Sequence, residues 1–253
     1  MIVSTLPAAR ETLTVIVPCL NEVGNVARTV ESVRAVLARI DLAGEIELVD
    51  DGSTDGTARE MERLCAAHEG VRMHVNPRNL GVGRSVLQAY DRIPPGHWVT
   101  VVAGDNEIVF DSIRYHLDIR DRYDIVLGYL QNPIIRTIPR RMASEAFTRT
   151  IRLIYGYPYR YLNGLKLYRV EAFRGIDVVS SGHAFNAELL AKAVLRNPNL
   201  RIGEAPFVAR GRATGFSKAI RLRSVLQAMS DVYRGYRSVS AYRELVVQRQ
   251  IQD

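Results

Sequence analysis

The sequence predicts an α/β protein in which a mostly parallel sheet is flanked by helices. Short apolar runs alternate with segments whose apolar residues recur every three or four positions, as in strands that alternate with amphipathic helices. Acidic or amide residues directly follow three of the apolar runs, which is typical of the ligand-binding edge of an open α/β sheet. At 253 residues the chain is long enough for one such domain with a substantial core.

The first half of the chain is predicted to supply most of the sheet. The apolar run 13–18 stops at a proline, and the helix that follows begins at Asn25, with valines at three- and four-residue spacing. The same two patterns repeat along the chain. The predicted strands are 13–18, 45–49, 71–75, 98–103 and 125–128, and the predicted helices are 25–37, 55–67 and 81–90.

After Pro139 the pattern becomes richer in helices. The predicted elements are a helix at 140–155, an extended piece at 165–169, a helix at 184–195, a strand at 201–208 and helical patterning from Ser217 nearly to the end. No internal repeat or low-complexity linker divides the chain. We therefore predict one compact domain over residues 1–215 and an amphipathic helical C-terminal arm over residues 216–253.

The excess of positive charge lies at the C-terminal end. Lys and Arg number 34 against 27 Asp and Glu, and residues 210–249 alone account for the net charge of +7. Such a basic segment suits an anionic membrane surface, phosphorylated substrates or nucleic acid. No nucleic-acid-binding motif accompanies it, so we expect no nucleic-acid partner.

Cysteine content and hydropathy predict a cytoplasmic protein. Cys19 and Cys65 lie far apart without metal-ligand spacing, which favours free thiols in a reducing compartment. Residues 1–10 lack the apolar core of a signal peptide, and no run of about 18 apolar residues occurs. The basic arm adds the expectation that the protein lies peripherally at the inner face of a membrane.

Polar clusters follow the predicted strands at 13–18, 45–49 and 98–103. The clusters are Asn21-Glu22, Asp50-Asp51 and Gly104-Asp105-Asn106-Glu107. Because the carboxyl ends of parallel strands meet at one edge of a sheet, the clusters are predicted to converge. Convergent carboxylates suit a nucleotide's donor groups, or a divalent cation that in turn binds a diphosphate.

Several ordered motifs carry a resemblance to a known family. They lie at residues 17–22, 49–57, 79–81, 163–169, 185–190 and 212–218. With these motifs the chain resembles family 2 glycosyltransferases of the GT-A (Rossmann-like) fold, and within them the dolichyl- and polyprenyl-phosphate sugar synthases. The resemblance spans about residues 13–220 and is more specific for the fold and the donor than for the acceptor. It implies that residues 1–215 form the catalytic domain.

The resemblance implies a donor site for a GDP- or UDP-linked sugar. The implied donor-binding residues are Pro18, Leu20, Glu22, Val49, Asp51, Gly104 and Asp105. Asp105 and Glu107 are implied to hold Mg²⁺ or Mn²⁺, although Ala103 stands where the family has a first aspartate. Arg212 and Lys218 resemble a basic pair that stabilises the leaving diphosphate, and with Asp105 they form the implied catalytic set. A degenerate, metal-free site is the alternative.

Arg140 and Ser144 lie one helical turn apart and resemble the pair that holds an acceptor phosphate in lipid-phosphate glycosyltransferases. A positively charged helix start is the alternative reading. The chain departs from the family at Tyr129-Leu130, where relatives place a Ser-Arg pair, and Arg136 is the candidate to replace the missing arginine.

No catalytic base stands out in the sequence. A phosphate acceptor is already ionised at neutral pH and needs none, whereas a hydroxyl acceptor requires one. Arg160 occupies the position of a common family aspartate, which leaves Glu188 as the base candidate or as a structural residue.

Together with the resemblance, these observations predict a metal-dependent glycosyltransferase that moves a sugar from a nucleotide-diphospho-sugar to a polyprenyl or dolichyl phosphate. The resemblance implies that the transfer inverts the anomeric carbon. Two alternatives are a transferase with a soluble hydroxyl acceptor and a non-catalytic nucleotide-sugar-binding protein. In the arm, one stripe combines Leu222, Leu226, Met229, Tyr233 and Tyr236, flanked by arginines. This stripe suits a membrane surface, or it docks onto the catalytic domain or a second copy in a homodimer.

Overall fold

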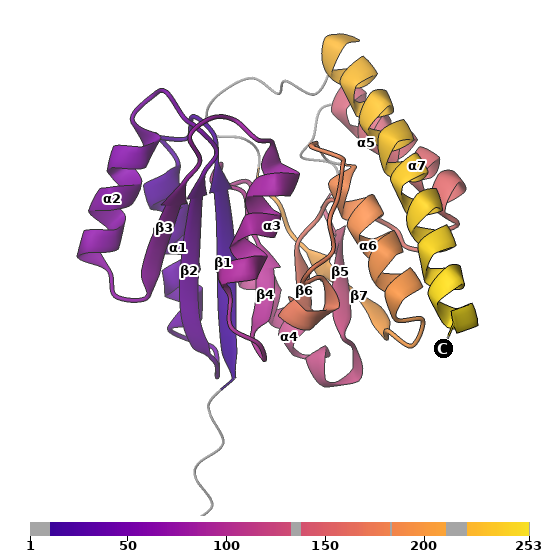
Figure 1. The fold of residues 1–253 in the computed structure, drawn as a ribbon. Coiled ribbons are helices and arrows are strands. Elements are labelled where there is room, and N and C mark those ends of the chain that lie inside the picture. The colour runs from indigo at the N-terminus through magenta and orange to yellow at the C-terminus, as the bar shows by residue number, and fades with distance from the viewer. Residues whose placement is uncertain (1–10, 133–137, 183, 211–221, 253) are drawn as a thin grey trace, which may run out of the picture.

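The computed structural model describes residues 11–132, 138–182, 184–210 and 222–252. The predicted domain boundary between residues 215 and 216 lies outside them. Within the described residues, a seven-stranded sheet has helices on both faces (Figure 1). The strands are β1 (Thr12–Cys19), β2 (Ala43–Asp50), β3 (Val71–Val75), β4 (Trp98–Val101), β5 (Ile125–Leu130), β6 (Lys166–Arg169) and β7 (Ile202–Phe207). Every predicted strand is present.

The strand order is β3-β2-β1-β4-β6-β5-β7. Strand β6 runs antiparallel to both of its neighbours, and the other paired strands run parallel, so the prediction of a mostly parallel sheet is confirmed. Because β6 is reversed, its first residue lies level with the carboxyl end of β4. The segment 163–165, which leads into β6, therefore reaches the same sheet edge as the polar clusters.

The helices fill the connections between the strands. They are α1 (Val26–Leu37), α2 (Thr57–Ala67), α3 (Val82–Arg92), α4 (Ile113–Leu117), α5 (Ile138–Tyr155), α6 (Phe185–Arg196) and α7 (Leu222–Gln252), with 3-10 turns η1 (Phe110–Ser112), η2 (Arg120–Arg122) and η4 (Val170–Ala172). The sequence pattern does not predict α4 or the 3-10 turns, because elements this short show no periodicity. Among the described helices, none combines the length and the apolarity needed to cross a bilayer.

The core consists of two apolar layers, one on each face of the sheet. Helices α1, α2 and α4 cover one face, and α3, α5, α6 and α7 cover the other. Along β1, Val15 and Val17 enter the first layer and Ile16 enters the second, as the alternation of a strand requires. Burial on both faces explains why Val15, Ile16 and Val17 are apolar in succession instead of alternating with polar residues.

Helix α7 packs beside α6 and α5 (Figure 1), but not through the stripe that the sequence singles out. Val232 and Val239 of α7 are buried. Of the stripe, Met229, Tyr233 and Tyr236 are exposed, Met229 to 65%. For these three residues the prediction that the stripe docks onto the rest of the chain is therefore wrong. A membrane surface and a second copy remain as alternatives for this face.

Candidate functional site

Three loops meet at the carboxyl ends of β1, β2 and β4. In the parallel register Cys19 pairs with Asp50, and the Asp51 N–H donates to the Cys19 carbonyl at 2.8 Å. On the other side, the Gly104 N–H donates to the Pro18 carbonyl at 3.1 Å. The β1 loop thus lies between the other two, and the predicted convergence of the clusters is confirmed.

The first two loops are joined by side-chain hydrogen bonds that the sequence analysis did not anticipate. The Asn21 N–H donates to Ser53 Oγ at 2.9 Å, and the Thr54 N–H donates to Asn21 Oδ1 at 2.8 Å. Asn21 has a φ of 57°, a left-handed conformation that asparagine adopts more readily than most residues. The only sequence signal for this contact was the asparagine itself, because asparagine in a loop often adopts the left-handed conformation and bonds to nearby backbone groups.

The predicted donor residues of the β1 loop lie at different depths. Pro18 is buried, and Leu20 is partly exposed. Glu22 is also partly exposed, and its carboxylate accepts a hydrogen bond from Asn25 Nδ2 at 2.8 Å. Its backbone N–H donates to Thr57 Oγ1 at 2.9 Å, which fixes the loop against the start of α2. Glu22 therefore presents a carboxylate whose position is already set by the two neighbouring helices.

The two adjacent aspartates after β2 have different surroundings. Asp50 accepts hydrogen bonds from the N–H and the hydroxyl of Ser53 and so closes the turn that follows the strand. Val49, before them, is fully buried in the core, so only its backbone remains for contact with a nucleoside. Asp51 is 4% exposed, and its carboxylate points toward the loop before α3.

Asp51 is held by four donors. Asp51 Oδ1 accepts from Asn76 Nδ2, the Leu80 N–H and Ser85 Oγ at 2.8–3.2 Å, and Oδ2 accepts from the Gly81 N–H at 3.0 Å. A carboxylate oxygen can accept at least two hydrogen bonds. Among the described donors, three reach Oδ1 and one reaches Oδ2, so Oδ2 has capacity to accept a further hydrogen bond. The sequence did not indicate that this residue also anchors a turn.

The third loop packs tightly on the first. A Cβ added at Gly104 would lie 2.5 Å from Cys19 Sγ, so a larger residue would force the buried thiol or the loop to shift. In the next turn, Asp105 Oδ1 accepts from the Glu107 N–H at 3.1 Å, and Asn106 has a φ of 55°. Asp105 is partly exposed and Glu107 is buried, so the two predicted metal ligands differ in access to solvent.

The electrostatics of Cys19 show that the site is acidic. Burial raises the pKa of the thiol, and the carboxylates of Glu22, Asp50 and Asp105 raise it further. One carboxylate from each loop thus acts on the same sulfur atom. The raised pKa keeps the Cys19 thiol protonated at neutral pH.

The donor set fits a hard cation that shares its shell with a phosphate. Among the described residues, no group of three or more His, Cys, Asp and Glu side chains is placed to hold a metal. Mg²⁺ in phosphate-binding sites commonly takes only one or two carboxylates and completes its octahedron with phosphate oxygens and water. Asp105, with Glu107 two residues on, meets that requirement.

Substitution of Gly104 by alanine is expected to destabilise the protein by about 1–3 kcal/mol, because the added methyl overlaps Cys19 Sγ. Chemical denaturation measures the change. Gly24→Ala is the matched control, since nothing lies within 4 Å of its added Cβ. Equal stability of the two variants would contradict the close packing of the first and third loops.

The predicted acceptor and leaving-group residues are described in part. Arg140 and Ser144 both lie on α5, and Ser144 is half-buried, but the Arg140 side chain lies outside the description. Arg212 and Lys218 lie outside the described residues, as does Arg136. Their roles therefore stay predictions.

At the carboxyl end of β5 a cation lies against Tyr129, the residue before Leu130, where the family arginine is missing. The Arg160 guanidinium lies 4.2 Å from the centroid of the Tyr129 ring, and Arg160 Nε lies 3.7 Å from a Glu204 carboxylate oxygen. The Arg160 side chain is 64% exposed. The sequence analysis noted this arginine only as a departure, because 31 positions separate it from Tyr129.

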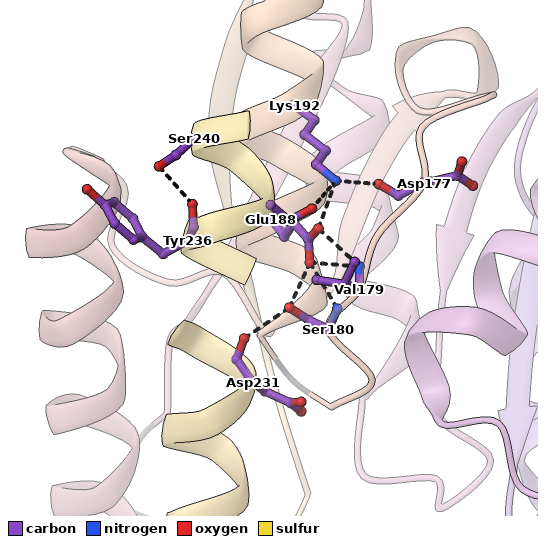
Figure 2. Close-up of polar contacts among 9 residues, drawn as sticks. Asp177, Val179, Ser180, Glu188, Lys192, Asp231, Tyr236 and Ser240 are labelled. Atoms are coloured by element: carbon purple, nitrogen blue, oxygen red, sulfur yellow. Dashed lines mark hydrogen bonds and ion pairs between the residues drawn. The ribbon is translucent and has the colours of Figure 1, made fainter. Parts of the chain in front are cut away.

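Glu188, the candidate base for a hydroxyl acceptor, is a structural residue. Its side chain is fully buried, and it accepts hydrogen bonds from Lys192, Ser180 and the Val179 N–H (Figure 2). Burial alone would raise the pKa of Glu188, but the hydrogen bonds from Lys192 and Ser180 hold it below its ordinary value. An ionised, fully hydrogen-bonded carboxylate in the core does not collect a proton from a substrate.

Comparisons with known sequences agree with this geometry. The profile of a family described as "Glycosyl transferase family 2" matches residues 14–185. The chain is 29% identical over 238 residues to dolichol-phosphate mannosyltransferase of Saccharomyces cerevisiae, covering 87% of this chain and 86% of that protein. It is 28% identical over 211 residues to dodecaprenyl-phosphate galacturonate synthase of Rhizobium johnstonii, covering 81% of this chain.

A hexosyltransferase of low-salt glycan biosynthesis from Haloferax volcanii is 26% identical over 209 residues, which cover 79% of this chain. The matches cover only 48% of the Haloferax protein and 61% of the Rhizobium protein. Among solved structures, glucosyl-3-phosphoglycerate synthase of Mycobacterium tuberculosis superposes with a TM-score of 0.66 at 16% identity, covering 92% of this chain and 80% of that one. This likeness shows a shared fold.

Proposed function

Because this chain belongs to glycosyl transferase family 2, we propose that it moves a sugar from a nucleotide-diphospho-sugar to a polyprenyl or dolichyl phosphate. The convergence of three acidic loops around Cys19 carries the proposal. Carboxylates gathered in this way favour the binding of a divalent cation, and the cation in turn favours the binding of a diphosphate. The family implies inversion at the anomeric carbon.

The donor is proposed to lie along the β1 and β2 loops. Asp51 Oδ2 accepts an N–H of the nucleobase with its remaining lone pair, while Glu22 at the partly exposed rim accepts from a hydroxyl. Leu20 and the backbones of Pro18 and Val49 line the same loops. Whether the base is guanine or uracil is left to the binding experiment below.

The diphosphate is proposed to lie beside the third loop. Asp105 and Glu107 would hold Mg²⁺ or Mn²⁺ there, and the cation would neutralise charge on the leaving nucleotide diphosphate. Gly104 lets this loop approach β1 closely enough for Asp105 to join the other two clusters. Arg212 and Lys218 are proposed to add positive charge to the leaving group.

A phosphorylated acceptor is favoured by the cation beside β5. Arg160 stands next to the position where the family's Ser-Arg pair is missing, and its exposed guanidinium suits a phosphate. Ser144 and Arg140 on α5 are proposed to hold the same phosphate. Such an acceptor enters already ionised, which is consistent with the structural role of Glu188.

The lipid portion of the acceptor is proposed to come from an anionic membrane surface. Helices α5 and α7 contact each other, and both expose apolar side chains. The exposed apolar residues are Ile138, Met142 and Leu153 on α5 and Met229, Tyr233, Tyr236, Leu245 and Val247 on α7. Exposed arginines such as Arg141 and Arg237 accompany them, as on helices that lie on anionic lipid. A second copy of the chain is the competing occupant of this face.

The acceptor is tested by incubating the protein with Mg²⁺, radiolabelled UDP- or GDP-sugars and anionic vesicles that contain polyprenyl phosphate. Label is expected in the lipid phase, and vesicles with the matching unphosphorylated polyprenol are the control. Leu130, in place of the family's arginine, supports the second candidate, a soluble acceptor. Label that appears only in water-soluble products of a cell extract would establish that candidate and overturn the lipid assignment.

A further inference from the structure

Residues 177–182 form a loop, named the 177–182 loop, that is hydrogen-bonded to α6. Glu188 accepts hydrogen bonds from the Val179 N–H at 3.1 Å, the Ser180 N–H at 3.0 Å and Ser180 Oγ at 2.7 Å (Figure 2). The first half of the loop is therefore fixed to the catalytic domain by one buried carboxylate.

A second buried carboxylate holds the other half of the loop from α7. Asp231 is 2% exposed, and its Oδ2 accepts from the Gly182 N–H at 2.8 Å. Ser181 Oγ also donates to this carboxylate, at 3.4 Å. Ser180 Oγ lies 3.2 Å from the Asp231 carbonyl oxygen, although its single proton is closer to Glu188. At Gly235 an added Cβ would lie 2.7 Å from Ser180 Oγ, so the absence of a side chain there lets α7 approach the loop closely.

Between the contacts with Glu188 and Asp231, the loop backbone packs against the turn that precedes α3. The Gly83 N–H donates to the Ser181 carbonyl at 3.4 Å. A Cβ added at Gly81 would lie 2.7 Å from the same carbonyl oxygen, and one added at Gly83 would lie 2.9 Å from the Ser180 carbonyl oxygen. Glycine at both positions lets the two backbones touch directly, without an intervening side chain that absorbs movement.

The same turn orients Asp51. The N–H groups of Leu80 and Gly81 donate to the two oxygens of its carboxylate at 2.8 and 3.0 Å. A shift of the turn therefore changes which direction the remaining lone pair of Oδ2 faces. A continuous series of backbone and carboxylate contacts thus extends from α7 to Asp51, which is proposed to bind the nucleoside.

Burial of the Asp231 carboxylate does not by itself stabilise the packing of α7. Val232 and Val239 supply apolar contacts on the same face, and burying a carboxylate among them costs free energy unless donors satisfy it. Its cationic partner, Arg234, is half exposed. The donors that satisfy the buried part of Asp231 are those of the 177–182 loop, so the contact favours one position of that loop.

We propose that Asp231 is a positioning residue for nucleotide binding: by fixing the 177–182 loop from α7, it sets the turn that orients the Asp51 carboxylate. This inference rests on the proposed function, in which Asp51 reads the nucleoside. It assigns to the C-terminal helix a part in donor recognition without contact between that helix and the donor.

The test compares Asp231→Ala with Val239→Ala, a variant that weakens the packing of α7 but leaves the 177–182 loop contacts in place. Dissociation constants for UDP and GDP are measured with Mg²⁺ by calorimetry. Asp231→Ala is expected to raise the dissociation constant of the preferred diphosphate roughly tenfold, against less than about twofold for Val239→Ala. Asp231→Asn keeps one acceptor oxygen for Gly182 and is expected to recover most of the affinity.

Hydrogen exchange of the ligand-free protein gives a second readout. The amides of Leu80 and Gly81 are expected to exchange faster in Asp231→Ala than in Val239→Ala at matched thermal stability. If the unsubstituted protein binds neither diphosphate, the proposed function is overturned, while exchange still decides the coupling. If it binds one, and the two variants agree in affinity and exchange, Asp231 has no positioning role.

Discussion

Replacement of Asp105 by alanine is expected to lower kcat/KM for sugar transfer about 100- to 1000-fold, equivalent to ~3–4 kcal/mol of transition-state stabilisation. Asp105 is the partly exposed carboxylate of the third loop, and it acts electrostatically on the same thiol as Glu22 and Asp50. If Asp105 holds the cation as proposed, the substitution removes a hard ligand and weakens the cation that would neutralise the leaving diphosphate. Initial rates over a titration of Mg²⁺ or Mn²⁺ measure the loss.

Asp111→Ala is the control for this substitution. Asp111 is an exposed carboxylate six residues further on, and it forms an ion pair with Arg39 at 3.3 Å. Its removal is expected to change kcat/KM by less than about twofold, as is usual for a surface ion pair. A partial recovery of Asp105→Ala at high metal concentration would agree with a weakened metal site. Turnover that is unchanged in Asp105→Ala would contradict the metal assignment.

Replacement of Glu188 by alanine is expected to lower the free energy of unfolding by about 3–5 kcal/mol, because it leaves the Lys192 ammonium buried without its charged partner. The two side chains are 0% and 6% exposed, and their charged atoms lie 2.8 Å apart. The substitution also strands the N–H groups of Val179 and Ser180. Urea denaturation followed by circular dichroism measures the change.

Glu145→Ala is the matched control, since Glu145 pairs with Arg149 at the same helical spacing but is 65% exposed. Its loss is expected to cost about 0.3–0.5 kcal/mol. The pKa of Glu188 is lowered in the folded protein, so its contribution is present above its ordinary value of 4.5 and is lost as the pH falls through the folded-state pKa. The difference between Glu188→Ala and the unsubstituted protein is therefore expected to shrink in acid. Equal losses for both glutamates would contradict the buried network.

The strands and the long helices follow from the sequence because their patterns are local. The apolar run 13–18 and the valine periodicity after Asn25 identify β1 and α1. The orientation of β6 has no such local signal: its short apolar pattern fits a parallel or an antiparallel strand equally well. The direction of β6 depends on its pairing with β4 and β5, which lie far from it in the chain.

The candidate site divides in the same way. The position of Asp105 and Glu22 at one edge follows from the rule that parallel strands end together. The contacts of Asp51 do not follow from it, because its donors come from Asn76 to Ser85, beyond the next strand. The position of Arg160 beside Tyr129 is equally non-local.

The exposed face of α7 was also decided by tertiary packing. Apolar periodicity identifies a stripe on a helix but not the surface that covers it. Here the buried face contains Asp231, whose charge is tolerated because the backbone N–H of Gly182 and the hydroxyl of Ser181 satisfy it. The sequence pattern does not identify a face that contains an aspartate as the buried one.

The sequence by itself determined the fold class and the sheet edge at which three polar clusters meet, because these depend on local periodicity and on the alignment of parallel strands. The family was indicated by the resemblance of the ordered motifs. The tertiary structure decided which carboxylates remain available for a ligand and which are used to hold the protein together. Asp51 and Glu188 are both acidic residues within the motifs. Glu188 is satisfied by core donors, whereas Asp51 Oδ2 has a single donor among the described contacts. The physical reason is that a carboxylate's availability depends on the donors around it, and those donors come from segments distant in the chain.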